Sequence, residues 1–423
     1  MILPPARPAP PACVDELVAR LGRDRVSIDP VRRQEASLDH AWLSPILTAA
    51  LPDQPADVVV TPLVDEDVAV TLAVAHQWGV AVTARGKGTG NFGQAVPLAA
   101  GIVLDTSELA GVIDVGDGWI DARAGTSFVR LEAAANQAGQ ELAMFPSTVG
   151  SALGGFLAGG AGGTGSIENG FLWDGFVGEL ELLPCWDQPE PIVLAGAAVT
   201  PHLHAYGTTG VVVRARVALR PARRWVALFA SFDRFDDAVA AGRQLLALDP
   251  LPRNLSIDDA DLVALLPPHP RMPGGQVSLR AIVDASTVPE ASVDPGAVSL
   301  LVSLSYNHVT LRAKRGRPDL CHLQVGGPAL VEDHDAVRAV FPGAMLHLDA
   351  HAPGGTIGFG GLLLAPFVDP ATLYAGVEHL RALGVHVVDP HTWLLSGDAD
   401  TVRAARRFDP LGLLNPGKLP PSG

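Results

Sequence analysis

The sequence predicts an α+β protein of two domains, for three reasons. The chain has 423 residues, which is long for a single domain. Residues 58–84 have the pattern of a β-α-β unit that leads directly into a glycine-rich loop at 85–94. After Pro221, short strands alternate with helices from 225 to about 388, as in an α+β domain with an antiparallel sheet.

The first half is expected to open with a short helix over 14–21. Acidic residues at 65–67 indicate the first turn of a helix that Gly79 ends. A further helix is expected over 127–138. Arg214 and Arg216 alternate with apolar residues, which predicts a half-exposed strand at 211–219. The other expected strands are 58–60, 80–84, 101–105, 111–115, 119–124 and 177–183.

The second half is expected to hold three helices, at 236–248, 331–340 and 371–383. Its expected strands are 225–229, 277–283, 298–304, 344–348 and 356–364. The tail at 408–418 is too rich in turn-forming residues to be a helix. It is also too apolar to stay free in solvent, so we expect it to pack against the rest of the chain.

The composition excludes several classes of protein. Apolar residues make up 48% of the chain and charged residues 18%, which argues against disorder. The formal net charge of -15 disfavours nucleic acids and anionic membrane surfaces as partners. Cys13, Cys185 and Cys321 are too far apart in sequence for a zinc or disulfide framework. No apolar leader or membrane span is evident, so a cytoplasmic location is expected.

Residues 142–175 are the most informative stretch of the chain. Ten glycines fall between positions 150 and 175, and no charged residue occurs from 142 to 167. Two alternatives are a membrane helix and a flexible linker, but small and polar residues dominate, and Leu153, Phe156 and Leu157 suggest one buried helix face. Glycine allows a backbone to approach a ligand closely, so the stretch predicts that the protein wraps a large cofactor.

Two glycine patterns resemble the dinucleotide fingerprint but lack its context. The patterns begin at Gly88 and Gly160. The fingerprint requires a strand before it and a helix opening at its last glycine, and neither pattern has both. What remains is two loops suited to hold phosphates with backbone amides. Arg85, beside the first loop, could pair with phosphate or cap a strand end.

These motifs together resemble the FAD-binding domain of the vanillyl-alcohol oxidase / p-cresol methylhydroxylase flavoproteins, most closely the glycolate oxidase and D-lactate dehydrogenase branch. The resemblance covers roughly 50–222 and 405–420. The motifs that carry it are Arg85-Gly-Lys-Gly-Thr-Gly-Asn-Phe-Gly-Gln94, Gly101-Ile-Val-Leu-Asp105, Pro146-Ser-Thr-Val-Gly150, His204-Ala-Tyr-Gly-Thr-Thr-Gly210 and Asp409-Pro-Leu-Gly-Leu-Leu-Asn-Pro-Gly-Lys418.

The resemblance implies FAD held between two α+β subdomains, with a smaller antiparallel α+β cap domain over the isoalloxazine ring. The implied division is an N-terminal segment at 1–50, the FAD-binding domain at 51–222, the cap at 223–395 and a C-terminal segment at 396–423 that returns to the FAD site. Family members with covalent flavin carry a histidine in the first loop. Thr89 and Gly90 occupy that place here, so we expect noncovalent FAD.

The resemblance also assigns residues to FAD. The residues expected to face the pyrophosphate or lie beside it are Arg85, Gly86, Lys87, Gly88, Thr89, Gly90, Asn91 and Gln94. Those expected to line the other side of the cofactor are Pro146, Ser147, Thr148, Gly150, Gly154 and Gly155. Gly207, Gly210 and Val212 would hold the ribityl and adenine portions, and Asn415 and Lys418 would reach the flavin from the C-terminus.

The cap should supply a base, because oxidation of an alcohol removes a proton as well as a hydride. His308, with Asn307 beside it, follows the expected strand at 298–304; a histidine that only satisfies a turn fits there too. His351 and His391 are the other candidates. On a strand, His351 would share one face with His347 and Asp349, which suits a metal or a solvated edge strand. No metal is expected.

A basic run at 312–317 contains Arg312, Lys314, Arg315 and Arg317. It could bind a carboxylate, but a solvated surface run explains it better. The hypothesis is therefore an FAD-dependent oxidoreductase that transfers hydride from a small alcohol-bearing substrate to flavin, with 2-hydroxy acids as one class. The alternatives are an NADPH-dependent reductase with the same FAD site and a flavin subunit of an electron-transfer complex. The electron acceptor is left open.

Overall fold

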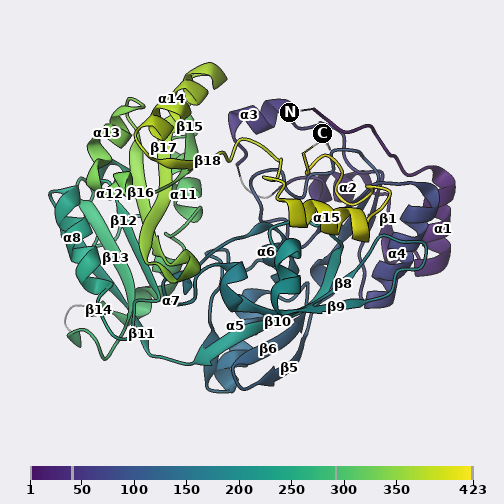
Figure 1. The fold of residues 1–423 in the computed structure, drawn as a ribbon, viewed down its shortest axis with the longest axis horizontal. Helices are drawn as coiled ribbons and strands as arrows, with labels where there is room; N and C mark the ends of the chain where they lie inside the picture. Colours follow the sequence, from purple (N-terminus) through teal and green to yellow (C-terminus); the bar gives the residue numbers. More distant parts are fainter. Residues whose placement is uncertain (1, 40–41, 291–292, 421–423) are drawn as a thin grey trace.

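The computed structural model describes residues 2–39, 42–290 and 293–420, and three sheets organise this part of the chain. Figure 1 shows two of them in the first half of the chain and the third, larger sheet beside them. This architecture confirms the α+β fold with an antiparallel cap. None of the described helices is both long and apolar enough to cross a lipid bilayer.

The first sheet has the order β1-β2-β4-β3, and its last three strands are parallel. Its strands are β1 (Val26–Ser27), β2 (Val58–Val60), β3 (Val82–Arg85) and β4 (Ile102–Asp105). The crossover from β2 to β3 is α4 (Asp65–Trp78), which ends at Gly79 in the left-handed conformation (φ 65°). The expected β-α-β unit is therefore confirmed. The other helices here are α1 (Pro11–Leu21), α2 (Pro30–Ala36) and α3 (Pro45–Ala50).

The second sheet is antiparallel, in the order β5-β6-β10-β8-β9, with β7 paired to the end of β10. Its strands are β5 (Val112–Gly116), β6 (Trp119–Arg123), β7 (Gln140–Leu142), β8 (Val177–Leu183), β9 (Ile192–Ala195) and β10 (Val211–Pro221). Its apolar face packs on α5 (Phe128–Gln137) and α6 (Leu153–Gly159). Short helical turns complete this half at Thr106–Glu108, Ser166–Asn169 (α7), Leu172–Phe176 and Gly196–His202.

The third sheet forms the cap, in the order β14-β11-β13-β12-β16-β17-β15-β18, with every neighbouring pair antiparallel. Its strands are β11 (Trp225–Phe232), β12 (Asn254–Asp258), β13 (Val277–Asp284), β14 (Val293–Asp294), β15 (Leu320–Gly326), β16 (Met345–His351), β17 (Gly358–Pro366) and β18 (His386–Val388). Its helices are α8 (Phe235–Leu245), α9 (Ala260–Val263), α10 (Val298–Val302), α11 (His308–Gly316), α12 (Ala329–Glu332), α13 (His334–Ala339) and α14 (Pro370–Ala382), with 3₁₀ turns at Pro295–Ala297 and Pro353–Gly355.

The strand expected at 298–304 is wrong, because residues 298–302 form the helix α10. Ala297, Leu301 and Leu304 are buried while Ser299 is exposed, a spacing that belongs to a helix and not to a strand. A short apolar run does not distinguish a buried strand from a buried helix by composition alone. His308 therefore does not follow a strand; it is the first residue of α11.

The tail after α15 (Ala399–Phe408) packs as expected against the first sheet, without forming a helix. The amide of Val82 donates to the carbonyl of Leu413 at 2.8 Å, and the amide of Asn415 donates to the carbonyl of Val82 at 2.7 Å. Through these two bonds the tail lies beside β3 at the edge of the first sheet. The tail therefore pairs with the first residue of β3, the strand that leads into the first glycine-rich loop.

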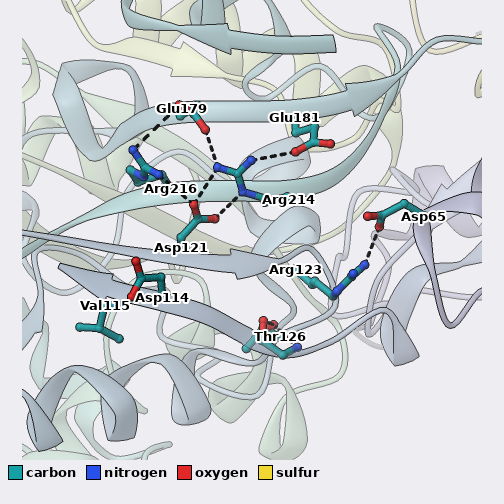
Figure 2. Close-up of polar contacts among 11 residues, drawn as sticks. Asp65, Asp114, Val115, Asp121, Arg123, Thr126, Glu179, Glu181, Arg214 and Arg216 are labelled. Carbon is teal, nitrogen blue, oxygen red and sulfur yellow. Dashed lines mark hydrogen bonds and ion pairs between the residues drawn. The ribbon is translucent and has the colours of Figure 1, made fainter. Parts of the chain in front are cut away.

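The outer face of the second sheet carries a charged network centred on Arg214 (Figure 2). Arg214 Nε and Nη2 donate to the two carboxylate oxygens of Asp121, each at 2.7 Å. Its guanidinium also donates to Glu179 at 2.5 Å and to Glu181 at 2.9 Å. Burial alternates strictly along β10, so the half-exposed strand is confirmed. Arg214 is the cation that keeps three carboxylates together.

Arg214→Met should lower the stability of the protein by about 2 kcal/mol, because Asp121 is buried and loses its bidentate partner. Thermal unfolding of the variant is the measurement. Arg216→Met is the control: Arg216 donates one bond to Asp121, at 3.1 Å, and should cost less. Equal losses in the two variants would contradict this account.

Candidate functional site

A cavity of about 740 Å³ lies between the glycine-rich segments of the first half and the inner face of the cap sheet. That volume lies within the usual range for small-molecule and cofactor sites. One wall comes from four separate stretches, at 84–95, 146–162, 171–173 and 204–212. The opposite wall comes from the cap, at 306–311, 324–326, 349–362 and 386–396. The cavity is thus built by segments that are far apart in sequence.

The first loop lies directly on helix α6, and a missing side chain makes this possible. A β carbon added to Gly86 would lie 2.8 Å from the β carbon of Ala152, which real structures do not tolerate. Gly154, inside α6, meets Ala124 in the same way, also at 2.8 Å. Glycine at these positions lets the backbones approach: the amide of Gly154 donates to the carbonyl of Ala124 at 2.8 Å, and both glycines line the cavity.

Two hydroxyl groups join the glycine-rich segments across this contact. Thr89 Oγ1 and Ser151 Oγ are 2.8 Å apart, and both residues line the cavity. Gln94 Nε2 donates to the carbonyl of Gly159 at 3.3 Å, further along the same contact. The first loop is therefore fixed to the second stretch at its middle, through Thr89, and at its C-terminal end, through Gln94.

Most residues that the sequence assigned to FAD lie in this cavity wall. Those that line it are Arg85, Gly86, Lys87, Gly88, Thr89, Gly90, Asn91, Gln94, Pro146, Ser147, Thr148, Gly154, Gly155, Gly207, Gly210 and Val212. Gly150, Asn415 and Lys418 are not part of the lining. Their contact with FAD stays a prediction.

Asn415 and Lys418 instead hold the first loop from behind. Asn415 Nδ2 donates to the carbonyl of Gln94 at 2.8 Å and to that of Tyr206 at 2.7 Å. Lys418 Nζ donates to the carbonyls of Gly93 and Val96. Burial lowers the pKa of Lys418 to about 7, although the nearby carboxylate of Asp39 opposes that shift. Both side chains brace the loop without entering the cavity.

The two cations of the first loop already have protein partners. Arg85 Nη1 donates to the carbonyl of Glu35 at 3.0 Å, and its guanidinium covers Gly88, which adopts a positive φ of 64°. Lys87 Nζ donates to the carbonyl of Ser107 at 3.3 Å. Burial lowers the pKa of Arg85, and Asp105 and Asp39 oppose this. A phosphate at this loop would therefore meet backbone amides together with an already anchored arginine.

The cap brings three of the four candidate catalytic residues to the cavity. Asn307 and His308 line it from the start of α11, and His351 lines it from the end of β16. Burial lowers the pKa of His308, with Arg312 acting in the same direction. Burial also lowers the pKa of His351, whose ring lies 5.1 Å from that of Phe171. Both imidazoles are therefore neutral near pH 7 and able to accept a proton.

His391 is fully buried and lies outside the lining, although Pro390 and Thr392 on either side of it line the cavity. Burial lowers the pKa of His391 as well. A catalytic role for this residue stays a prediction. The basic run at 312–317 divides in the structure: Lys314 is buried, whereas Arg317 pairs with Asp319 at the surface.

β16 is a central strand of the cap sheet, so the solvated edge strand considered for His347, Asp349 and His351 is wrong. The three side chains share one face as expected, but His347 and Asp349 are buried. Both carboxylates beside His347 are hydrogen-bonded to it. Among the described residues, no three histidine, cysteine or acidic side chains converge as metal ligands.

Several residues of the site were not foreseen from the sequence. Tyr306 donates its hydroxyl to the carbonyl of Gly163 at 2.6 Å and so connects the cap to the glycine-rich stretch. Gln324 lines the cavity from β15, a strand that the sequence did not predict. Phe171 and Trp173 line it from the turn that follows the glycine-rich stretch. The sequence signal that could have located Phe171 and Trp173 is that two aromatic side chains lie close together in a turn.

FAD fits this arrangement of residues. Both glycine-rich segments and the cap line the cavity. Added β carbons at Gly86 and Gly154 would disrupt its wall. Accessible backbone amides suit a diphosphate, and the cap side presents neutral imidazoles and a carboxylate, Asp349.

Comparisons with known proteins agree with this geometry. Residues 56–182 match the model of the FAD binding domain family. An uncharacterized FAD-linked oxidoreductase of Mycobacterium tuberculosis is 28% identical over 219 residues, which is 48% of this chain and 47% of the relative. A D-lactate dehydrogenase of Archaeoglobus fulgidus is 28% identical over 194 residues, 43% of each chain. The chain thus aligns with about half the length of these curated relatives.

The fold extends the likeness over the whole chain. A solved structure of alkyldihydroxyacetonephosphate synthase superposes with a TM-score of 0.75, covering 99% of this chain and 87% of that one at 16% identity. At that identity the likeness shows the fold alone. The matched domain at residues 56–182 and the glycine-lined cavity show that this chain carries an FAD-binding domain of the p-cresol methylhydroxylase type.

Proposed function

We propose that the protein is an FAD-dependent oxidoreductase that oxidises a small alcohol-bearing substrate. The observation that carries the proposal is one cavity with two chemically different walls. One wall is the glycine-rich FAD-binding surface, and the other presents His308, His351 and Asn307 from the cap. A substrate held between them would lie against both the coenzyme and a base.

Bound FAD supplies the two-electron acceptor for hydride. The protein's part is to hold the substrate hydroxyl and to take its proton. His308 and His351 suit that role, because burial keeps each imidazole neutral and both line the cavity. Asn307, beside His308, has a side-chain oxygen without a hydrogen-bond partner among the described residues, so it is free to orient a substrate hydroxyl.

Noncovalent FAD is part of the proposal. The first loop offers Thr89 and Gly90 where covalent members carry a histidine, and Thr89 is already bonded to Ser151. The D-lactate dehydrogenase among the relatives makes 2-hydroxy acids the first class to test. The division into an FAD-binding domain at 51–222 and a cap at 223–395, with flanking segments 1–50 and 396–423, is the one we propose. The cytoplasmic location also stays a prediction.

Gly86→Val should abolish most FAD binding, because its side chain would strike Ala152 where the first loop meets α6. The flavin content of the purified variant, measured by absorbance after acid release, is the readout. Gly178→Val, at an exposed position of β8 outside the cavity lining, is the matched control: an added β carbon there meets only the carbonyl oxygen of Arg216, at 3.8 Å. A wild-type protein that is colourless and cannot be reconstituted with FAD would overturn the assignment.

Anaerobic mixing of the holoenzyme with 2-hydroxy acids, simple alcohols and sugars should bleach the flavin absorbance with at least one of them. His351→Gln and His308→Gln should retain FAD, and the variant that lacks the base should be reduced about 10²–10⁴-fold more slowly. Failure of every hydroxy acid would remove that substrate class. Reduction by NADPH alone would indicate the reductase alternative, and flavin that only a partner protein activates would indicate an electron-transfer subunit.

A further inference from the structure

Four charged side chains form a line through the interior of the cap and end at the cavity. They are Arg280 on β13, Asp258 on β12, and His347 and Asp349 on β16. Their exposed fractions are 1%, 0%, 0% and 3%. The sheet register explains their alignment, because Asp258 is paired with His347 and Ser256 with both Asp349 and Arg280. Of the four, only Asp349 lines the cavity.

Contacts within this array fix the charge of each member. Arg280 forms an ion pair with Asp258. Asp258 Oδ1 lies 2.6 Å from His347 Nδ1, and Asp349 Oδ2 lies 2.8 Å from His347 Nε2. Because both ring nitrogens face carboxylate oxygens, His347 is held as an imidazolium. Burial alone would lower its pKa, but the flanking carboxylates Asp349 and Asp258 raise it to about 9.

Asp349 has three hydrogen-bond donors, which hold it as a carboxylate. Besides His347, Ser256 Oγ donates to its Oδ1 at 2.7 Å, and the backbone amide of Tyr306 donates to its Oδ2 at 2.8 Å. Burial raises the pKa of this acid, but these contacts lower it overall. Tyr306 adopts a positive φ of 51°, a strained conformation for a non-glycine residue, at the point where it meets Asp349.

Stability alone does not explain such an array. Buried ion pairs are seldom more stabilising than apolar residues of similar volume, because each charge loses its hydration. A strained backbone held by a buried carboxylate is likewise typical of functional sites. The array is therefore expected to act at the one end that reaches the cavity, where Asp349 is part of the lining.

His351 is the candidate base on which the charge of this carboxylate acts. It follows Asp349 by two residues on the same face of β16, so the two side chains are about 7 Å apart. Gly360 on the neighbouring strand makes room for the ring: an added β carbon would lie 2.5 Å from His351 Cε1. Among the described residues, the charge of Asp349 opposes the lowering of the His351 pKa by burial, and a hydrogen bond to the backbone of Asp349 acts in the same direction.

Other titratable groups around His351 are occupied or uncharged. On α7, Glu168 pairs with Arg223 at 2.9 Å. In the helical turn that follows α7, Asp174 accepts hydrogen bonds from the amides of Phe171 and Gly354. Burial raises the pKa of the Tyr306 phenol, so this group stays protonated. On the far side of the cavity, β18 contributes His386, which is exposed.

We propose that Asp349, fixed by this array, is a positioning residue that stabilises the protonated form of His351 and so enables His351 to take the substrate's hydroxyl proton. The proposal rests on the proposed function. In the reaction the O–H proton moves to the imidazole of His351, the C–H hydrogen leaves as hydride to FAD, and the C–O single bond becomes a carbonyl. Asp349 takes part only through its charge.

Two substitutions with opposite effects on charge test the proposal in the FAD-loaded protein. Asp349→Asn removes the negative charge and should lower the pKa of His351 by about one unit. His347→Gln removes the positive charge beyond it, keeps a donor for Asp349, and should raise the pKa of His351. Asp259→Asn, a buried carboxylate that pairs with Arg338 outside the cavity, should leave it unchanged.

NMR titration of the ring-labelled histidines measures this pKa without a substrate, with the His351 signal assigned by its loss in His351→Gln. Structural damage is not expected to shift the pKa of His351 in opposite directions in the two variants. If one variant fails to fold, the shift predicted for the other still tests the proposal. An unchanged pKa in both variants, or shifts in the same direction, would overturn the proposal. The acid limb of the flavin reduction rate should move with the pKa. If the expected NMR shifts are found but no substrate reduces the flavin, the proposed function fails, and only the electrostatic effect of Asp349 on His351 is retained.

Discussion

The site depends on the contact between the first glycine-rich loop and helix α6, where backbones meet without side chains between them. Gly86 faces Ala152 and Gly154 faces Ala124, each too closely for a β carbon. A larger residue at Gly86 would separate the loop from α6 and break the Thr89–Ser151 bond that joins them, whereas one at Gly154 would push α6 away from Ala124 at the end of β6. The accessible backbone groups of the cavity wall exist because this contact is closed.

The rest of the FAD-binding half maintains that contact. β3 delivers the loop, and the C-terminal tail bonds to β3 through Val82 and to the loop through Asn415. Lys418 is buried behind the loop, where its ammonium group satisfies the carbonyls of Gly93 and Val96. Burial of a lysine is costly unless it is compensated. The tail is thus a structural part of the site although it lies more than 300 residues away in sequence.

Local signals predicted the first half well. The acidic first turn and closing glycine of α4, the alternation along β10 and the glycine pattern around α6 each depend on neighbouring residues, and the structure has all three. The cap was predicted less well. An apolar run at 298–302 is compatible with either strand or helix, and only the packing of Leu301 and Leu304 decides for a helix. β12, β15 and β18 are too short or too irregular in pattern to stand out.

The same limit explains which site residues the sequence located. The loop residues follow from a local motif, and their neighbours in the chain are their neighbours in the site. Asp258 and Arg280 could not be connected with His347, because their proximity comes from the order β13-β12-β16, which links strands about 90 residues apart. The spacing of His347, Asp349 and His351 was visible, but its meaning depended on whether β16 is an edge or a central strand.

The central position of β16 turns that spacing from a solvated face into a buried electrostatic array. Because the pKa of His347 is raised above its value of 6.5 in the unfolded chain, the array stabilises the folded protein fully below pH 6.5. That contribution is lost as the pH rises through about 9, where the imidazolium deprotonates. Asp349 therefore keeps its charged partner, His347, across neutral pH. In this range the half-buried His351 is neutral and has a fixed carboxylate beside it that favours its protonated form.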